Sequence, residues 1–150
     1  MQKYKYLEHT ADAKFESYGK TIEEAFQNAT YAMENIITDT ETIEPKIKKD
    51  ISIKSENLGS LLYDWLEKLI TMLELEGFLL GKVKIKKIKE IKKDTEKGKL
   101  HYYILTAAIK GDTYHQKYEL KTEIKAITYN DMKIKKNKDN TWTITAVVDI

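Results

Sequence analysis

The sequence contains no cysteine and no arginine. Without cysteine, the chain can form neither disulfides nor zinc–thiolate sites, and it has no thiol nucleophile. All 26 basic residues are lysines, so the chain has no guanidinium group to bind guanine bidentately or to act as an arginine finger. No apolar run is long enough to cross a bilayer, and the first residues lack a signal-peptide pattern. We therefore expect a cytoplasmic protein without a membrane partner.

The length and the charge of the chain indicate one small domain. A chain of 150 residues can bury a core without disulfide or metal staples, and we expect a single domain over residues 1–150. The formal net charge is +2. This near balance does not by itself indicate a nucleic-acid-binding protein.

Two stretches have the periodicity of amphipathic helices. Thr21 and Glu24 form a capping box, in which the threonine hydroxyl accepts a backbone N–H and the glutamate reaches back. Apolar residues at helical spacing follow until about Ile37. A leucine-rich stripe that begins at Leu58 predicts a second helix, which Gly77 would end as its C-cap.

Apolar and polar residues alternate over most of the remaining chain, as they do in half-buried β-strands. The expected strands cover residues 3–7, 14–18, 47–53, 78–91, 100–110, 123–129, 132–136 and 141–148. We expect a hairpin loop at 94–98, a turn at 137–140 and an exposed polar loop at 111–120. Two helices among about eight strands predict an α+β fold, a mostly antiparallel β-sheet with two amphipathic helices packed on it.

A polar cluster, His9-Thr10-Ala11-Asp12, separates the first two expected strands. Asp12 suits a turn, because its side chain can accept hydrogen bonds from nearby backbone amides. It also suits a metal site, since Ca²⁺ and Mg²⁺ prefer carboxylate and carbonyl oxygens. Asp149 and the chain end at Ile150 would supply further oxygens if the two ends of the chain meet. Both interpretations stay open on the residues alone.

No pattern of catalytic residues is present. The histidines, His9, His101 and His115, lack the i, i+4 spacing of a helical zinc pair, and we expect the last two on the surface. The sequence has no glycine-flanked serine elbow and no phosphate-binding G-x-x-x-x-G-K-[ST] loop. A metal-dependent hydrolase built on His9 and Asp12 would lack a nucleophile and a base. The residues alone therefore identify no catalytic site, and they indicate only an α+β domain with a possible acidic ion site.

Lysines are concentrated between Lys82 and Lys93. Strand alternation puts several of them on one face, which could attract RNA or an acidic protein. However, no aromatic stacking pattern accompanies them, and lysine is common on solvated strand faces, where it also guards sheet edges against aggregation. RNA contact therefore has only weak support from the sequence.

A lysine, a threonine and a tyrosine lie near the end of one expected strand, as Lys125, Thr128 and Tyr129. Alternation sends Lys125 and Tyr129 to one face of the sheet and Thr128 to the other, unless a bulge intervenes. An ordinary sheet edge explains the segment equally well, because no catalytic base accompanies it.

Several segments, in this order, resemble the archease family over essentially the whole chain. They are Tyr6-Leu7-Glu8-His9-Thr10-Ala11-Asp12, Gly19-Lys20-Thr21 with Glu24-Ala25-Phe26, Leu61-Leu62-Tyr63-Asp64-Trp65-Leu66, Lys125-Ala126-Ile127-Thr128-Tyr129 and Val148-Asp149-Ile150. Any one of these segments alone would be unspecific, but their order along the chain makes the resemblance specific.

The resemblance implies a small, non-enzymatic activator of the tRNA-splicing RNA ligase. That ligase joins 2′,3′-cyclic-phosphate or 3′-phosphate ends to 5′-hydroxyl ends, after it has attached GMP from GTP to its own histidine with the help of manganese. The activator is expected to promote this guanylylation and so to sustain multiple turnover in tRNA splicing and RNA repair. A general chaperone or modulator of RNA-processing enzymes is the alternative.

The resemblance also implies which residues act. The family's divalent metal site is formed by the aspartate of the H-T-A-D motif and by the chain end, which match Asp12, Asp149 and Ile150. Calcium is the expected ion, with magnesium or manganese as alternatives. The residues implied at the ligase interface are His9, Lys125, Thr128 and Tyr129.

The sequence departs from the family pattern at two positions where a histidine is common. Asn130 follows the Thr-Tyr pair, and Tyr118 follows Lys117. These departures leave the proposed metal ligands untouched, but no histidine at either position can contribute to a site.

Overall fold

The computed structural model describes residues 2–9, 11–114 and 117–150. Thr10 of the H-T-A-D motif and His115, which we expected on the surface, lie outside the described residues. The elements are β1 (Tyr4–Leu7), β2 (Asp12–Gly19), α1 (Ile22–Ile37), a 3₁₀ helix η1 (Thr40–Thr42), β3 (Ile47–Ser55), α2 (Leu58–Glu76), β4 (Phe78–Thr95), β5 (Gly98–Thr113), β6 (Ala126–Lys136) and β7 (Trp142–Asp149). None of the described helices is long and apolar enough to cross a membrane.

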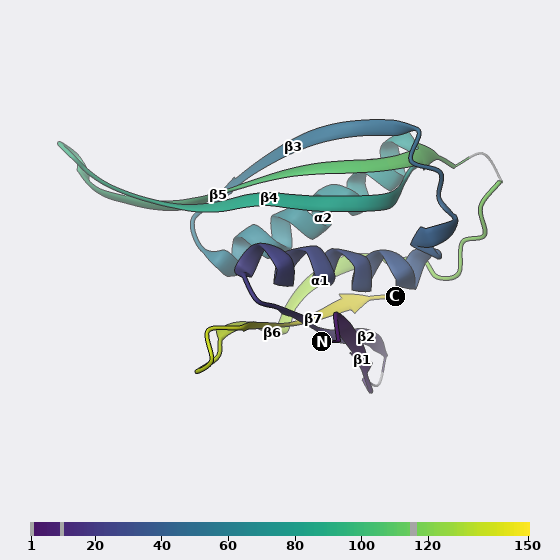
Figure 1. Ribbon diagram of the computed structural model, residues 1–150, viewed down its shortest axis with the longest axis horizontal. Helices are drawn as coiled ribbons and strands as arrows, with labels where there is room; N and C mark the ends of the chain where they lie inside the picture. The colour runs from purple at the N-terminus through teal and green to yellow at the C-terminus, as the bar shows by residue number, and fades with distance from the viewer. Residues whose placement is uncertain (1, 10, 115–116) are drawn as a thin grey trace.

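The strands form two separate sheets, in which all described pairings are antiparallel. One sheet has the order β1-β2-β7-β6 and the other has the order β3-β5-β4. Both helices lie between the sheets and pack against each of them (Figure 1). The expected α+β fold with two helices on antiparallel strands is confirmed, with the difference that the strands are divided between two sheets.

Each helix begins at a side-chain cap. The Thr21 hydroxyl accepts the Glu24 amide at 3.1 Å, as expected. The Glu24 carboxylate accepts the Lys20 amide and not that of Thr21, so only the threonine half of the expected capping box forms. Asn57 caps α2, and Gly77 ends this helix with a left-handed φ of 67°, a conformation that favours glycine. The sequence therefore located both helices from their ends.

The core lies in the helix layer, because each helix must bury apolar side chains toward both sheets. Trp65 of α2, Phe26 of α1 and Phe15 of β2 are completely buried in one hydrophobic cluster. The Trp65 indole N–H donates to the Thr30 hydroxyl of α1 at 2.9 Å, which satisfies the one polar atom that this side chain brings into the core.

A row of polar side chains on α1 binds the open edge of β4. The backbone amides of Ile88, Ile85 and Val83 donate to Glu23, Gln27 and Tyr31, respectively, at 3.1 Å each. The three acceptors are four residues apart, so they lie on one face of the helix. They satisfy edge groups that would otherwise be open to pairing with another chain.

Residues 111–120 do not form the exposed loop that we expected. Residues 111–113 belong to β5, and both Asp112 and Tyr118 are buried. The Tyr118 hydroxyl donates to the Asp112 carboxylate at 2.7 Å, and this bond holds the pKa of Asp112 below its usual value. Two polar residues that satisfy each other can therefore be buried, although each alone resembles a surface residue.

The prediction of two strands at 123–129 and 132–136 is also wrong, because the structure has one continuous strand there, β6. Its register with β7 shifts between Thr128 and Lys133, where extra residues bulge out of the pairing. The chain therefore has seven described strands instead of about eight.

Glu34 of α1 makes the stability of the fold depend on pH. Its side chain is 3% exposed, and burial raises the pKa of its carboxyl from 4.5 to about 8. Between these two pH values the folded state holds a proton that the unfolded state has lost, so the free energy of unfolding falls as pH rises through this window. Glu34→Gln removes the effect and should stabilise the protein relative to wild type by on the order of a few kcal/mol at the upper end.

Urea unfolding at the two ends of the window measures this difference. The matched control is Glu74→Gln, which changes an exposed glutamate of α2 and should leave the pH dependence as in wild type. Equal pH dependence in the wild type and the Glu34→Gln variant would show that burial does not perturb this carboxyl.

Candidate functional site

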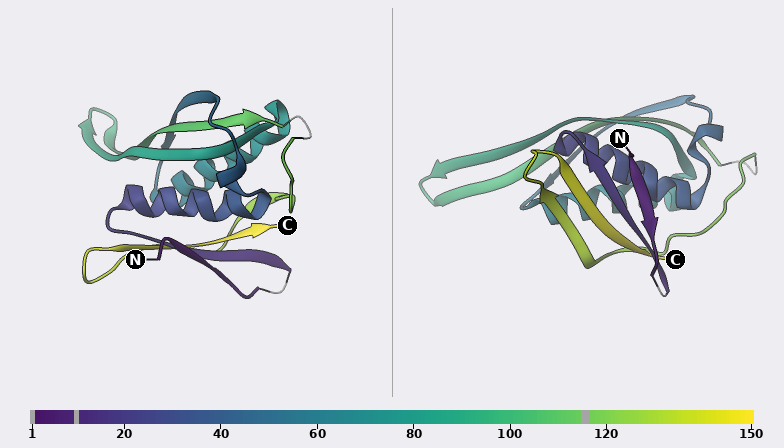
Figure 2. Two further views of the ribbon diagram at one scale, coloured as in Figure 1. Left: turned by 45° about the vertical axis from the view of Figure 1, so that its right-hand side comes forward. Right: turned by 60° about the horizontal axis from the view of Figure 1, so that its bottom comes forward.

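The two ends of the described chain meet through strand register. Asp12 is the first residue of β2, and its direct partner across the pairing is Asp149, the last residue of β7. Directly opposed residues in antiparallel strands have side chains on the same face. The start of β2, the end of β7 and the start of β6 lie together at one end of this sheet (Figure 2). Asp12 is thus in a strand, and the turn interpretation is not needed.

A backbone hydrogen bond brings the third segment to the same place. The Lys125 amide donates to the Asp149 carbonyl oxygen at 2.7 Å, and Ala126 is the register partner of Asp149. Ile150 follows directly and is 38% exposed. The proposed metal residues and the beginning of the Lys125–Tyr129 segment therefore lie side by side.

A charged cluster lies beside Asp12. His9 Nδ1 is 3.6 Å from Asp12 Oδ2, and His9 Nε2 is 3.9 Å from Asp131 Oδ2. The Lys14 ammonium lies 3.5 Å from the same Asp131 oxygen. The His9 ring thus lies between the carboxylates of Asp12 and Asp131, and Lys14 offsets part of the charge of Asp131.

Asp131 is a residue that sequence reasoning missed. It lies in the bulge of β6 with a φ of 55°, in the left-handed region that aspartate and asparagine tolerate better than most residues. The Asn130-Asp131 pair could have indicated this bend, because both residue types are common in turns. No pattern in the sequence indicates, however, that this bend directs the Asp131 carboxylate toward His9.

The described residues do not form a complete metal cage. They contain no group of three or more His, Cys, Asp or Glu side chains arranged to hold a metal ion. The donors available at this end of the sheet are the carboxylates of Asp12 and Asp149 and the backbone oxygens of Ile150. This set is chemically suited to a hard cation such as Ca²⁺, which takes carboxylate and carbonyl oxygens and completes its shell with water.

The residues implied at an interface divide between two sides of β6. Thr128 is paired with Val147 and so lies on the outer face, two residues along from Ala126. Its hydroxyl accepts the Asn130 amide at 3.1 Å. Tyr129 turns toward α2, where its ring stacks on Tyr63 with the centroids 4.4 Å apart.

Tyr129 remains accessible in this stack, with 56% of the residue exposed. Its pKa is raised, first by partial burial and then by the nearby acids Asp64 and Glu67 together with Tyr63. An exposed aromatic pair beside acidic groups is a suitable contact surface for another protein, since tyrosine combines apolar area with a hydroxyl. Tyr63 belonged to a family-like segment, but only the structure shows its contact with Tyr129.

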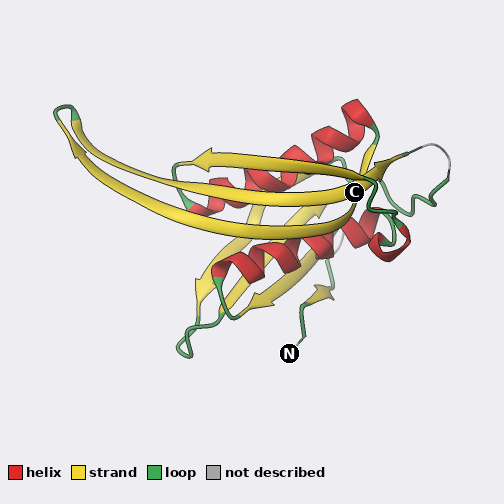
Figure 3. Ribbon diagram, turned by 45° about the horizontal axis from the view of Figure 1, so that its top comes forward, coloured by secondary structure: helices red, strands yellow, loops and turns green. Residues whose placement is uncertain are grey.

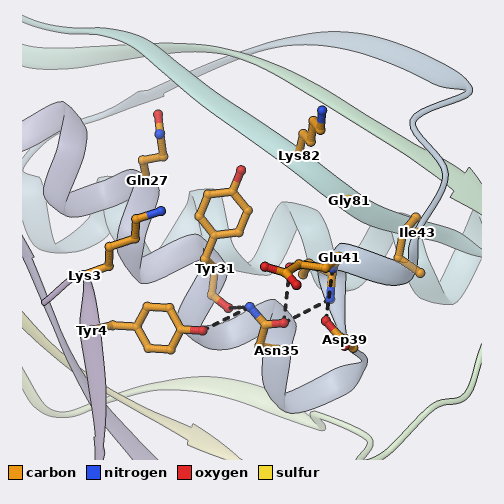
Figure 4. A pocket seen from close by; sticks show the side chains of 11 residues that line it. Lys3, Tyr4, Gln27, Tyr31, Asn35, Asp39, Glu41, Ile43, Gly81 and Lys82 are labelled. Carbon is orange, nitrogen blue, oxygen red and sulfur yellow. Dashed lines mark hydrogen bonds between the residues drawn. The ribbon is translucent and has the colours of Figure 1, made fainter.

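A cavity of about 630 Å³ opens on a different part of the molecule, between β1, α1 and β4. Its polar groups largely satisfy one another (Figure 4): the Asn35 amide donates to the Tyr4 hydroxyl and to the Tyr31 carbonyl, and its oxygen accepts from Thr40. None of the residues discussed above for a metal or an interface lines it. The cavity is therefore separate from the candidate site.

Comparisons with known proteins agree with this fold and with the motifs. Residues 4–150 match the Archease protein family. The protein archease of Methanosarcina barkeri is 42% identical over 150 residues, which cover 99% of this chain and 97% of the relative. That of Pyrococcus furiosus is 38% identical and covers both chains completely. The solution structure of Methanobacterium thermoautotrophicum protein 1598 matches over 100% of both chains, with a TM-score of 0.77 and 29% identity. The resemblance found in the sequence is thus confirmed, and this chain belongs to the archease family.

Proposed function

We propose that this protein is a non-catalytic, metal-binding activator of a tRNA-splicing RNA ligase, acting in the cytoplasm. It would promote the GTP-dependent guanylylation of the ligase and so allow each ligase molecule many turnovers. The observation that carries the proposal is the pairing of Asp12 with Asp149, because this register brings Asp12, the beginning of the Lys125–Tyr129 segment and Asp149 to one end of the sheet.

The proposed ion would be held by Asp12, Asp149 and a backbone oxygen of Ile150, with calcium as the expected cation and magnesium or manganese as alternatives. A bound divalent cation would supply positive charge at the end of the sheet, where Asp12 and Asp149 would otherwise repel each other. The role of the chain's own residues is then to fix the position of that charge. His9 and Thr128 on the outer face, together with Lys125 and with Tyr129 on the α2 side of β6, would contact the ligase.

Activation in this scheme is a shift of the partner's conformation. A protein that binds one state of the ligase more tightly than another changes the populations of the two states without doing chemistry itself. Exposed Tyr129 supplies apolar contact area, whereas the metal end supplies charge. The proposal therefore predicts two separable effects, one on affinity and one on the activated state.

The metal prediction concerns the two aspartates. Asp12→Asn and Asp149→Asn each remove one negative oxygen ligand, and we expect either change to raise the Kd for Ca²⁺ by about tenfold or more. Titration calorimetry with Ca²⁺, Mn²⁺ and Mg²⁺ measures the affinities, and thermal unfolding shows that the fold is retained. Both variants should also abolish activation of the ligase.

Glu16→Gln is the matched control, since Glu16 lies on the same strand and the same face and loses the same charge. It should keep wild-type affinity for the ion. The Asp131→Asn variant tests whether the carboxylate near His9 contributes to binding of the ion. Unchanged calcium binding in both the Asp12→Asn and Asp149→Asn variants would contradict the assigned ligands.

The interface prediction concerns the tyrosine stack. Tyr129→Ala removes the exposed ring and should cost about 1 kcal/mol of stability, while raising the concentration needed for half-maximal activation of the ligase. Because this variant keeps both aspartates, full activation should return at saturating protein. Tyr129→Phe keeps the stack, and Tyr114→Ala changes an exposed tyrosine elsewhere; both should behave more like wild type.

The decisive assay counts ligated RNA per ligase molecule in the presence of GTP and Mn²⁺, with and without this protein. A rise from about one turnover to many is expected if guanylylation limits the ligase. Equal stimulation of unrelated RNA-processing enzymes would favour the general chaperone alternative. No stimulation of a cognate ligase by the folded wild-type protein would overturn the proposal.

A further inference from the structure

The outer face of the β3-β5-β4 sheet is left uncovered by the helices. Both helices pack on the inner side of this sheet, and its other side is open along the whole length of the strands (Figure 3). Beyond the pair Ser55–Tyr103, where the pairing of β3 with β5 ends, β4 and β5 continue as a two-stranded arm to the pair Thr95–Gly98. The open face therefore extends from the body of the protein onto the arm.

Lysines dominate this face on both of its flanking strands. On β3, Lys48 and Lys54 alternate outward and are exposed. On β4, Lys82 and Lys84 face outward before the bulge, and Lys89 faces outward after it. Further lysines on this face are Lys86, Lys87 and Lys93.

The exposed acidic residue on the described part of this face is Asp50, which pairs with Lys86 at 3.6 Å. Asp112, two residues after Lys110 on β5, is buried and accepts a hydrogen bond from Tyr118. Although the chain as a whole carries a net charge of only +2, this face has a local excess of lysines. An overall balance conceals a local excess of this kind.

A row of three lysines crosses the sheet without any offsetting acid. Lys110 of β5 is the direct register partner of Lys48 on β3 and of Lys82 on β4. Like charges in directly opposed positions repel each other and destabilise a sheet. None of the three ammonium groups has an ion pair or a hydrogen bond within the described residues. The three lysines therefore repel one another in the free protein, and a bound anion would relieve this repulsion.

We propose that this face binds the phosphate backbone of RNA. Alternate residues along a strand repeat at about 6.8 Å, comparable to the distance between successive phosphates of a polynucleotide. Tyr102 lies on the same face, with the Lys54 ammonium 4.2 Å from the centre of its ring, and offers an aromatic surface beside the lysines. An acidic protein surface would use the charge but would have less use for such a platform.

The absence of arginine determines the kind of recognition. Lysine contacts phosphate as a point charge and lacks the planar fork that reads base edges bidentately. Binding on this face should therefore be independent of sequence and strongly dependent on salt. The proposal that this face binds RNA does not rest on the proposed activation of a ligase, because neither the surface nor its test involves a ligase.

The test compares two triple variants of equal charge. Lys48→Gln/Lys82→Gln/Lys110→Gln neutralises the row, and Lys133→Gln/Lys135→Gln/Lys138→Gln neutralises exposed lysines on β6 and the turn that follows it. Each variant removes three positive charges and changes the net charge from +2 to −1. Fluorescence anisotropy with a labelled single-stranded oligouridylate measures the Kd between about 50 and about 200 mM salt.

We expect the wild-type protein to bind the RNA and the row variant to bind it about tenfold more weakly or worse, with a salt slope smaller by about 2. The β6 variant should remain near wild type. The row variant should also unfold at the same or a higher temperature, because it loses the repulsion between its lysines, so a folding defect cannot explain the lost affinity.

Equal loss of affinity in the two variants would overturn the proposal, since the effect would then follow net charge alone. Failure of the wild-type protein to bind RNA at low salt would do the same. Binding of poly-glutamate as tightly as RNA would reassign the face to acidic proteins. Because ligase is absent from the assay, each of these results is distinguishable from a failure to activate the ligase.

Discussion

The hydrogen bonds between α1 and the edge of β4 are the contacts on which the arrangement of the two sheets depends. No described strand of one sheet pairs with a strand of the other, so only the helix layer can fix their relative position. Glu23, Gln27 and Tyr31 bind β4, while other residues of the same helix pack against β2 and β7. The Asp12–Asp149 end of one sheet and the lysine-rich outer face of the other therefore lie on opposite sides of the two-helix layer. The arm extends away from the end that carries Asp149 (Figure 1).

Sequence patterns located the elements that depend on local interactions. Thr21, Gly77 and the apolar stripes fixed both helices, because caps and helical periodicity act within a few residues. The resemblance likewise singled out Asp12 and Asp149, and the structure makes them register partners. That register joins residues at opposite ends of the chain. It depends on how β2, β7 and β6 pair in the folded protein, which no local pattern encodes.

The expectations that failed share a physical cause. We expected Asp112 and Tyr118 in an exposed loop because each is polar. They are buried, and the Tyr118 hydroxyl donates a hydrogen bond to the Asp112 carboxylate. Asp131 interrupts β6 without ending it, since the bulge returns the chain to the same partner strand. The register also aligns Lys82 with Lys110 and Lys48, which the alternation of lysines along β4 does not by itself predict. In each case the decisive neighbour is distant in sequence, so composition and period could not reveal it.

In the proposed cation site at Asp12 and Asp149, the chain supplies only part of the donor set. The described residues contain no group of three or more His, Cys, Asp or Glu side chains arranged to hold a metal ion. A hard cation held by few protein ligands keeps open coordination positions that water or a partner's oxygens can fill. His9 lies between Asp12 and Asp131, next to the proposed ligands. Such a site would suit the proposed activator, because oxygens of the partner could complete the coordination of the ion.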